Sequence, residues 1–516
     1  MILNLLREGR GGRPRRSLIV ADPKGECYAA AGAALEARGY IVRRLDFYDE
    51  RLGAPGYNPL AHIRTASEAL IFARSWIRNT RGQGEAGASA EFWDSTVALL
   101  LQAAILHLNH TYRARGEQAA PLARLLALFN VDDFALLKDE LLTSPCPEAV
   151  EAVRGFLGGT EKNERLGGSI LVGLLVKFAV LNDPAVARIT AHDDLPFSGV
   201  GDTTTAPLAL FVILTPGMEE VLQSLTGSLF MQLFDELVTA ANARPGQALA
   251  RRVFCYLDEI GTVGIIAGLP RRLATLRSAG VGMLLAAQDT IQLDTLYTPA
   301  GRRLITSTCQ VHIIFGGVGQ EDAAWVSSRL GTATVVGKSA NAGRQRGEIL
   351  VGQGGYTRGE TGRPLLTPEE IQQLPEGAAI LNGYHARPVL VRSLPWYKDR
   401  RLRRLAARAN ARQRRRARAH VTPVAQTPAQ RLPWDGEIPR DQDAARASSP
   451  IAPMEPAPEK PVTEKTVATP DTTASATATV PATPPRTPRA KAPAKGRKAP
   501  VAVPDDDPFA AASRDA

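Results

Sequence analysis

Two kinds of apolar spacing alternate along the first 400 residues. Short runs rich in Val, Ile, Leu and Phe predict buried strands near both ends of this region. Stretches with apolar residues three and four positions apart predict the helices between them. Strands that alternate with helices are typical of an α/β fold with a mostly parallel sheet. Strands are expected at 17–21, 40–47, 208–214, 253–257, 281–288 and 311–315, with a strand pair within 378–394.

The middle of this region has helical spacing and lacks strand-like runs. Across residues 64–195, apolar positions such as Phe92 and Leu101 follow a helical period, and glycine and proline clusters separate the helices. This pattern predicts an all-α domain of roughly 130 residues, which is within the usual range for a domain. The flanking segments, 1–63 and 196–397, are then two parts of one α/β domain.

Residues 398–516 differ in composition from the rest of the chain. Lys398 to His420 holds eleven Lys/Arg and one acid, a net charge of +10 that equals the net charge of the whole protein. From Thr422 onward Pro, Ala, Thr, Lys and Asp dominate, and such a segment buries too little apolar surface to fold. We therefore expect the fold to end at Lys398, with a basic segment and then a disordered tail.

The basic segment has two interpretations. Its arginines can hold nucleic-acid phosphates or an anionic membrane surface, because both contacts depend on charge, and the segment can form a helix on binding. The other interpretation is a solvated run of charge that aids solubility. We expect polyanion contact, because crowding eleven cations is costly without a counter-charge. The candidate contacts are Arg400, Arg401, Arg403, Arg404, Arg414, Arg415 and Arg416.

Cysteine, histidine and apolar content limit the class of protein. The four cysteines lie far apart without C-x-x-C spacing, and the seven histidines form no metal-like cluster. This argues against a disulfide framework or a zinc site and fits a reducing compartment. No apolar run approaches the roughly 20 residues that span a bilayer, and the start does not resemble a signal peptide. As written, the chain is expected to be soluble and cytosolic.

The segment from Val253 to Glu259 carries the strongest chemical signal. An apolar run ends there in two adjacent carboxylates, at the carboxyl end of an expected parallel strand, where open α/β sheets bind ligands. Asp258 can hold Mg²⁺ through water, and Glu259 can orient or deprotonate an attacking water. The following strand ends in Gln288, which suits a site that reads a γ-phosphate. An ordinary strand followed by polar residues is the alternative interpretation.

The usual partner of such an acidic strand, a G-x-x-x-x-G-K-[ST] phosphate loop, does not occur in the sequence. Gly331 to Ser339 has five residues rather than four between its glycines, and it follows an expected helix instead of a strand. Asp22-Pro23-Lys24-Gly25-Glu26 follows the first strand. Lys24 can approach a phosphate at a helix N-terminus. We favour the other interpretation, a turn whose Pro and Gly set the backbone.

The ordered set of motifs over residues 1–397 resembles the type IV secretion coupling proteins, the TraG/TraD-like ATPases of conjugative DNA transfer. Each motif is short, and their order carries the resemblance. They are Asp22-Pro23-Lys24-Gly25-Glu26, Tyr57-Asn58-Pro59-Leu60, Phe92-Trp93-Asp94, Leu257-Asp258-Glu259, Leu276-Arg277-Ser278-Ala279-Gly280, Ala287-Gln288, Gly331-Thr332-Ala333-Thr334 and the run from Arg363 to Ile371.

The resemblance implies a RecA-like P-loop NTPase motor domain interrupted by an all-α domain. Six copies would form a ring at the cytoplasmic face of the bacterial inner membrane and use ATP and Mg²⁺. The ring would recruit relaxase-bound single-stranded DNA, or protein effectors, and pass it to the secretion channel. By residue match, Asp258 is the Walker B magnesium acid, Glu259 the water-activating acid and Gln288 the strand-end sensor. Arg277 is a phosphate or inter-subunit contact.

The chain departs from this family at its start. Family members begin with transmembrane helices and then carry the phosphate loop, whereas Met1 to Leu6 resembles the segment just after that loop's helix. The expectation is an N-terminally truncated copy without membrane anchor or Walker A loop. The alternatives are a non-hydrolysing cargo-docking module or inactive remnant, and a different RecA-like translocase such as a chromosome-pumping or helicase relative.

Overall fold

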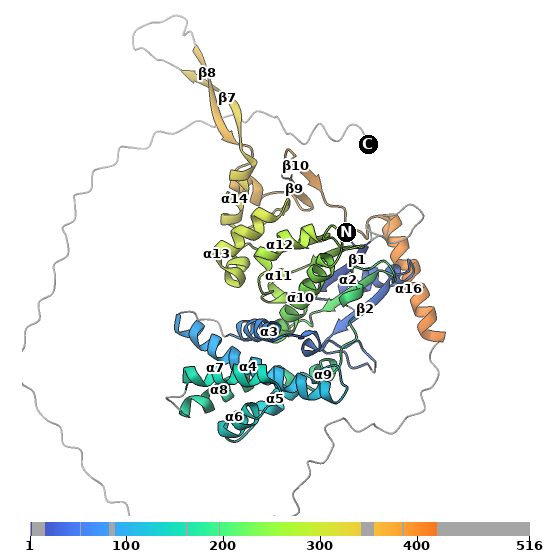
Figure 1. The fold of residues 1–516 in the computed structure, drawn as a ribbon. Coiled ribbons are helices and arrows are strands. Elements are labelled where there is room, and N and C mark those ends of the chain that lie inside the picture. Colours follow the sequence, from blue (N-terminus) through green and yellow to red (C-terminus); the bar gives the residue numbers. More distant parts are fainter. Residues whose placement is uncertain are drawn as a thin grey trace, which may run out of the picture. The chain divides into compact units, whose positions relative to one another are not determined.

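The computed structural model describes Ile2 and residues 16–51, 53–81, 88–160, 164–195, 197–341, 355–383 and 386–419 (Figure 1). The chain divides into two units, and all of these residues belong to the first, Met1–Gln426. The expected disordered tail from Thr422, and the segment Met1 to Leu6 apart from Ile2, lie outside the described residues. Among the helices that are described, none has the length and apolar content needed to cross a membrane.

A five-stranded parallel sheet forms the centre of this unit. Its strands stand in the order β2-β3-β1-β4-β5. β1 and β3 are buried almost throughout, as continuous apolar strands covered on both faces should be. The sheet confirms the predicted α/β class. Its strands are β1 (Arg16–Asp22), β2 (Ile41–Asp46), β3 (Leu208–Ile213), β4 (Arg252–Leu257) and β5 (Val281–Leu285).

Successive residues of a strand point to opposite faces of the sheet. Here both faces carry apolar side chains, and helices pack on each. On one face, Val20 belongs to an apolar cluster with residues of α2 (Glu26–Glu36) and with Leu402 of α16 (Arg400–Ala419). On the other face, Ile19 belongs to a larger cluster with Leu229 of α10 (Glu219–Asn242). α11 (Ile260–Val263) and α12 (Leu269–Ser278) lie between β4 and β5 in sequence.

A second sheet and a hairpin follow β5 in sequence. β6 (Val311–Phe315) pairs antiparallel with β9 (Ala378–Gly383), and β9 pairs with β10 (Val389–Arg392). β7 (Thr332–Asn341) and β8 (Gly355–Pro364) form a two-stranded hairpin (Figure 1). The segment from Gly331 to Ser339 therefore enters a strand and not a loop before a helix. The helices here are α13 (Ile291–Thr308), α14 (Gln320–Leu330) and α15 (Pro368–Gln372).

The described elements between β2 and β3 are all helical. The helix α3 (Ala66–Asn79) begins with a capping box. The Thr65 hydroxyl accepts a hydrogen bond from the Glu68 N–H, and the Glu68 carboxylate accepts one from the Thr65 N–H. Trp76 of this helix shares the large apolar cluster with the sheet. The elements are η1 (Pro59–His62), α3 (Ala66–Asn79), α4 (Ala88–Ala114), α5 (Ala123–Phe129), α6 (Phe134–Leu142), α7 (Pro147–Thr160), α8 (Glu164–Lys177), η2 (Ala179–Asn182), α9 (Pro184–Ile189) and η3 (Phe197–Gly199).

The basic segment after Lys398 differs from the expectation that the fold ends there. It forms the helix α16, which packs against α2. Leu402 is 8% exposed and Ala406 is 3% exposed, and the Asp399 carboxylate accepts a hydrogen bond from the Leu402 N–H. The charge count hid this contact. Three apolar positions at helical spacing, Leu402, Leu405 and Ala406, are enough to dock a helix whose other side is arginine-rich.

Candidate active site

The two acids after β4 lie at the carboxyl edge of the central sheet. Backbone hydrogen bonds continue the sheet past the assigned strand ends: the Asp258 N–H donates to the Ala21 carbonyl (3.4 Å) and the Ala286 N–H to the Leu257 carbonyl (2.9 Å). These bonds hold Asp258 between the ends of β1 and β5. The Asp258 side chain is exposed and that of Glu259 is half-buried, so water and a ligand can reach both carboxylates.

Glu259 and Gln288 meet across the ends of β4 and β5. The Gln288 side-chain amide donates to Glu259 Oε2 at 2.8 Å. The sequence predicted that the two would share one edge, because both follow neighbouring parallel strands. An amide that donates to the carboxylate leaves the second carboxylate oxygen to accept a hydrogen bond from water.

Asp258 has a partner on its own strand. The Tyr256 hydroxyl donates to Asp258 Oδ1. Burial, and then this hydrogen bond to a carboxylate, raises the pKa of Tyr256 above its usual range, so the phenol stays protonated. Alternation along a strand puts residues two apart on one face, but a tyrosine before an acid is no recognised motif, and sequence reasoning missed this contact.

The segment from Asp22 to Glu26 forms a turn that starts α2. The buried Asp22 carboxylate accepts from the backbone N–H groups of Cys27 (3.2 Å) and Tyr28 (2.8 Å), and Gly25 has a left-handed φ of 69°. Burial raises the pKa of Asp22, and the nearby Asp258 carboxylate acts in the same direction. The Pro and Gly of this motif therefore have a structural explanation. Lys24 is exposed and has no hydrogen bond or ion pair with another described residue.

A polar network joins the loops that follow β5 and β6. The Asp322 carboxylate accepts from the Thr290 N–H (3.1 Å) and from the Thr290 hydroxyl. Arg302 donates to the Thr290 hydroxyl (3.2 Å) and to Asp294 (2.9 Å). Sequence reasoning did not select these residues. The one signal available was that Thr290 stands two positions after Gln288.

Arg277 lies apart from these groups. It is exposed in the last turn of α12, just before β5 begins at Val281. Glu259 and Gln288 stand at the other end of the strands, so the length of β5, about 17 Å at ~3.3 Å per residue, separates Arg277 from them. Within one chain the structure does not bring Arg277 to the acids.

The chemistry of these groups fits Mg²⁺ better than it fits a nucleotide. Carboxylate oxygens and water are the ligands that Mg²⁺ prefers, and Asp258 offers an exposed carboxylate with Asp22 beside it. Among the described residues, no group of three or more His, Cys, Asp or Glu side chains forms a complete metal site, so Mg²⁺ would keep several waters or phosphate ligands. A triphosphate also needs backbone N–H donors and a Lys around its β- and γ-phosphates, and the sequence lacks that loop.

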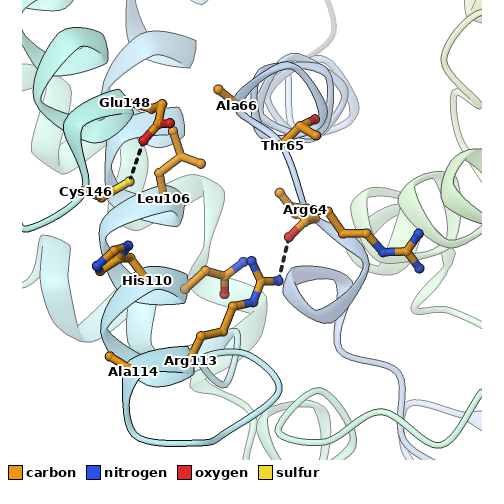
Figure 2. Close-up of a pocket in the computed structure, with 11 residues that line it drawn as sticks. Arg64, Thr65, Ala66, Leu106, His110, Arg113, Ala114, Cys146 and Glu148 are labelled. Carbon is orange, nitrogen blue, oxygen red and sulfur yellow. Dashed lines mark hydrogen bonds between the residues drawn. The ribbon is translucent and has the colours of Figure 1, made fainter.

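A separate pocket of about 510 Å³ lies among the helices, between the start of α3, the end of α4 and the start of α7 (Figure 2). Arg113 donates to the Ile63 carbonyl at 2.7 Å, and the Cys146 thiol donates to Glu148 at 3.3 Å. Arg64 turns away from the pocket and pairs with Glu236 at 3.5 Å. None of the residues that line this pocket is one of the predicted site residues.

The family model described as type IV secretory system conjugative DNA transfer matches residues 13–426. The chain belongs to this family. It is 26% identical over 373 residues to conjugal transfer protein TraG of Escherichia coli, and the match covers 70% of this chain and 58% of TraG. It is 23% identical over 398 residues to VirD4 of Rhizobium radiobacter, covering 76% of this chain and 55% of VirD4. The chain thus spans little more than half the length of these relatives.

Solved structures of TrwB, which is named as a conjugative coupling protein, share the fold. The conjugative coupling protein TrwB in complex with sulphate has a TM-score of 0.55 at 18% identity, over 73% of this chain and 78% of that chain. TrwB in complex with the ATP analogue ADPNP has a TM-score of 0.54 at 17% identity, over the same shares. At such identities the likeness establishes the fold alone. The resemblance to coupling proteins stated from the sequence motifs is confirmed at the level of the family.

Proposed function

We propose that this protein is the motor part of a coupling ATPase that drives DNA, or protein effectors, towards a type IV secretion channel. The observation that carries the proposal is the Asp258, Glu259 and Gln288 cluster at the carboxyl edge of a parallel sheet. Family membership supports the same conclusion. TrwB structures with ADP and Mg²⁺ and with ADPNP support ATP and Mg²⁺ as the cofactors.

In this proposal each residue of the cluster has one role. When bound, Mg²⁺ would offset charge on the phosphates, and Asp258 would hold it through water while Tyr256 fixes the carboxylate. Glu259 accepts a proton from water, because Gln288 engages only its Oε2 and the side chain is half-buried rather than fully enclosed. Gln288 holds the Glu259 side chain in place through the 2.8 Å hydrogen bond. Arg277 is exposed and lies far from this cluster in its own chain. A role for Arg277 in hydrolysis would therefore be at the site of a neighbouring copy.

Family membership alone does not identify the partners of this chain, so we propose them here. We propose a homo-hexamer at the inner membrane, with relaxase-bound single-stranded DNA as cargo and secretion channel proteins as the recipients. An inter-subunit role for Arg277 requires such a ring. We also propose that Lys24 makes a weak contact with a phosphate, which its exposure at the sheet edge allows.

α16 is our proposed nucleic-acid contact. Arg400, Arg401, Arg403, Arg404 and Arg408 are exposed, and none of them forms an ion pair with another described residue. The apolar side of the helix is occupied, because Leu402 belongs to the apolar cluster of α2, Leu405 packs against that cluster, and Ala406 is buried. A helix that binds a membrane must insert its apolar side, so this packing favours nucleic-acid phosphates over lipid. The side chains of Arg414, Arg415 and Arg416 lie outside the described residues.

A second candidate function is a docking module that binds cargo without hydrolysing ATP. The sequence favours it through the missing phosphate loop, without which much of the nucleotide affinity is lost. In this case the helices of residues 64–195 and the basic tail would bind the cargo. ATP binding distinguishes the two candidates.

The test is nucleotide binding by the purified chain 1–516, measured by calorimetry with ATP and Mg²⁺ and again with Asp258→Asn. The ATPase proposal expects Mg²⁺-dependent binding that weakens at least tenfold in the variant. Absence of ATP binding by this chain, together with cargo binding that ATP does not change, would favour the docking module.

A further inference from the structure

The helix α3 connects the helices of residues 64–195 to the central α/β part of the fold. Both α4, which follows it, and α10, which packs on the sheet, contact α3 (Figure 1). Two hydrogen bonds tie its last turn to the end of α8. Trp76 Nε1 donates to the Lys177 carbonyl at 3.0 Å, and Lys177 Nζ donates to the Thr80 carbonyl at 3.4 Å. The end of α3 is therefore fixed relative to the helices around it.

Asn79, the last residue of α3, binds the backbone of the segment that follows Glu259. Its Nδ2 donates to the Ile265 carbonyl at 3.0 Å, and its Oδ1 accepts from the Ile265 N–H at 2.6 Å. Nδ2 also donates to the Ser75 carbonyl at 3.0 Å. The opposite orientation of the amide would place its oxygen against two carbonyls, so this network allows one arrangement. Asn79 is 9% exposed, and hydrogen bonds at a buried amide are costly to lose.

Two glycines leave room for this contact. Gly264 precedes Ile265 and has a left-handed φ of 82°, and a Cβ there would lie 2.8 Å from Asn79 Oδ1. Gly227 is in α10, and a Cβ there would lie 3.0 Å from Asn79 Nδ2 and 2.8 Å from the Ile265 carbonyl oxygen. A side chain at either position would push Asn79 and Ile265 apart. The contact therefore depends on a glycine on both sides of it.

A short, hydrogen-bonded path leads from Ile265 back to Glu259. The two residues are separated by α11, a helix of four residues, and by Gly264. The Thr262 hydroxyl, inside α11, donates to the Glu259 carbonyl at 2.9 Å. At the end of α11, the Thr226 hydroxyl of α10 donates to the Val263 carbonyl at 2.7 Å. A segment this short and this firmly held transmits a shift at Ile265 to the Glu259 backbone, and so to the direction of its carboxylate.

We propose that Asn79 is a positioning residue for Glu259, through which the helices of residues 64–195 set the direction of this carboxylate. The end of α3 does not require the contact, because the Thr80 N–H already bonds to carbonyls of the last turn. The Asn79 amide instead binds a residue 186 positions away. A ligand or partner that shifts α3 would then alter the site without touching it. The importance of this direction for hydrolysis rests on the proposed function, whereas the contact does not.

The test compares Asn79→Ala with the matched control Asn109→Ala, each in the full chain 1–516. Asn109 is a buried asparagine of α4, and its side-chain amide binds the backbone of Leu60 (2.9 Å) and of Ala120 (3.3 Å). The control therefore removes a similar pair of hydrogen bonds without touching the segment after Glu259. Asn79→Asp is a second variant, used if the alanine variant does not fold. It keeps an acceptor for the Ile265 N–H and loses the donor at neutral pH.

The first readout is amide hydrogen exchange, measured by mass spectrometry. Peptides that cover residues 260–266 should exchange about tenfold faster in either Asn79 variant, because local opening of this segment becomes easier. The same peptides should be unchanged in Asn109→Ala, and β2 should be unchanged in all three proteins. Unchanged exchange at 260–266 in the Asn79 variants would overturn the proposal, and so would an equal increase in the control.

The second readout reports the Glu259 carboxylate itself. The Gln288 side-chain amide donates to Glu259 Oε2, so its NMR resonance in protein labelled with ¹⁵N-glutamine depends on where that carboxylate points. The resonance is identified by its loss in Gln288→Glu. It should move towards that of a free glutamine amide in the Asn79 variants and stay in place in Asn109→Ala. Faster exchange at 260–266 with an unmoved Gln288 resonance would overturn the positioning role and leave Asn79 a structural contact. Neither readout uses nucleotide, so a failure of the ATPase proposal would leave both results unaltered.

Discussion

Removing the arginines of α16 tests the nucleic-acid proposal most sharply. The change is Arg401→Ala, Arg404→Ala and Arg408→Ala together. These side chains lie three and four positions apart on one exposed stripe of the helix. The variant should fold normally, because alanine has the highest helix propensity and the buried Leu402 and Ala406 are unchanged.

The magnitude follows from counterion release. Each phosphate contact adds about −0.7 to the slope of log K against log salt for a single strand, so losing three contacts should reduce the slope by about 2. Between 50 and 200 mM salt the unchanged protein should then lose roughly 20-fold more affinity than the variant. At low salt the variant should bind more weakly, with little dependence on DNA sequence.

The assay is fluorescence anisotropy with a labelled oligothymidine at several salt concentrations. The matched control is Arg74→Ala, Arg124→Ala and Arg154→Ala, which removes the same charge from exposed positions on α3, α5 and α7. The control should keep the original slope. Equal slopes for the α16 variant and the unchanged protein would refute the argument. An equal reduction of the slope in the α16 variant and the control variant would also refute it. Preferential binding to phosphatidylserine vesicles would point to a membrane instead.

Three further predictions concern stability. Hydrogen bonds from Arg51 hold the pKa of Asp49 at about 2 against an ordinary 3.8, so its ionisation stabilises the fold above pH 3.8 and that contribution is lost as pH falls towards 2. Asp49→Asn should therefore reduce the drop in Tm between pH 5 and pH 3, and an unchanged drop would contradict the pairing. Gly227→Ala puts a Cβ 2.8 Å from the Ile265 carbonyl and should cost about 1–3 kcal/mol in urea unfolding; Gly173→Ala, where the space is open, should gain about 0.5–1 kcal/mol. Tyr256→Phe removes one hydrogen bond to the exposed Asp258 and should cost about 1 kcal/mol, and a loss above about 3 kcal/mol would mean that Tyr256 has a larger role in packing.

Much of the fold could be predicted because its strands are short apolar runs with polar ends. Buried parallel strands such as β3 leave a continuous apolar signature. The same signature placed Glu259 and Gln288 at one edge, since each directly follows such a strand. Their hydrogen bond follows from the order of the strands in the sheet. This order can be inferred for β4 and β5, because the two strands are neighbours both in the sheet and in the sequence.

Other parts of the site depend on contacts between distant segments. Asp322 meets Thr290 only because the helix after β6 begins beside the loop after β5, and no spacing in the sequence encodes that. The docking of α16 was missed because composition averages its few apolar positions with many arginines. The order of the motifs grouped Arg277 with the acids. In the fold, α12 runs back along the sheet, so Arg277 lies near the start of β5, at the end of the strands away from the acids.

The most direct test of the central claim is ATP turnover by the chain 1–516 with a strand, a G-x-x-x-x-G-K-[ST] phosphate loop and a helix fused before Met1, compared with Glu259→Gln in the same fusion, with ATP binding measured in parallel. The account predicts unchanged binding and a loss of turnover of about 10²–10⁴-fold, as expected when a general base is removed. Equal turnover in the two proteins would contradict the assignment of Glu259 as the water-activating acid.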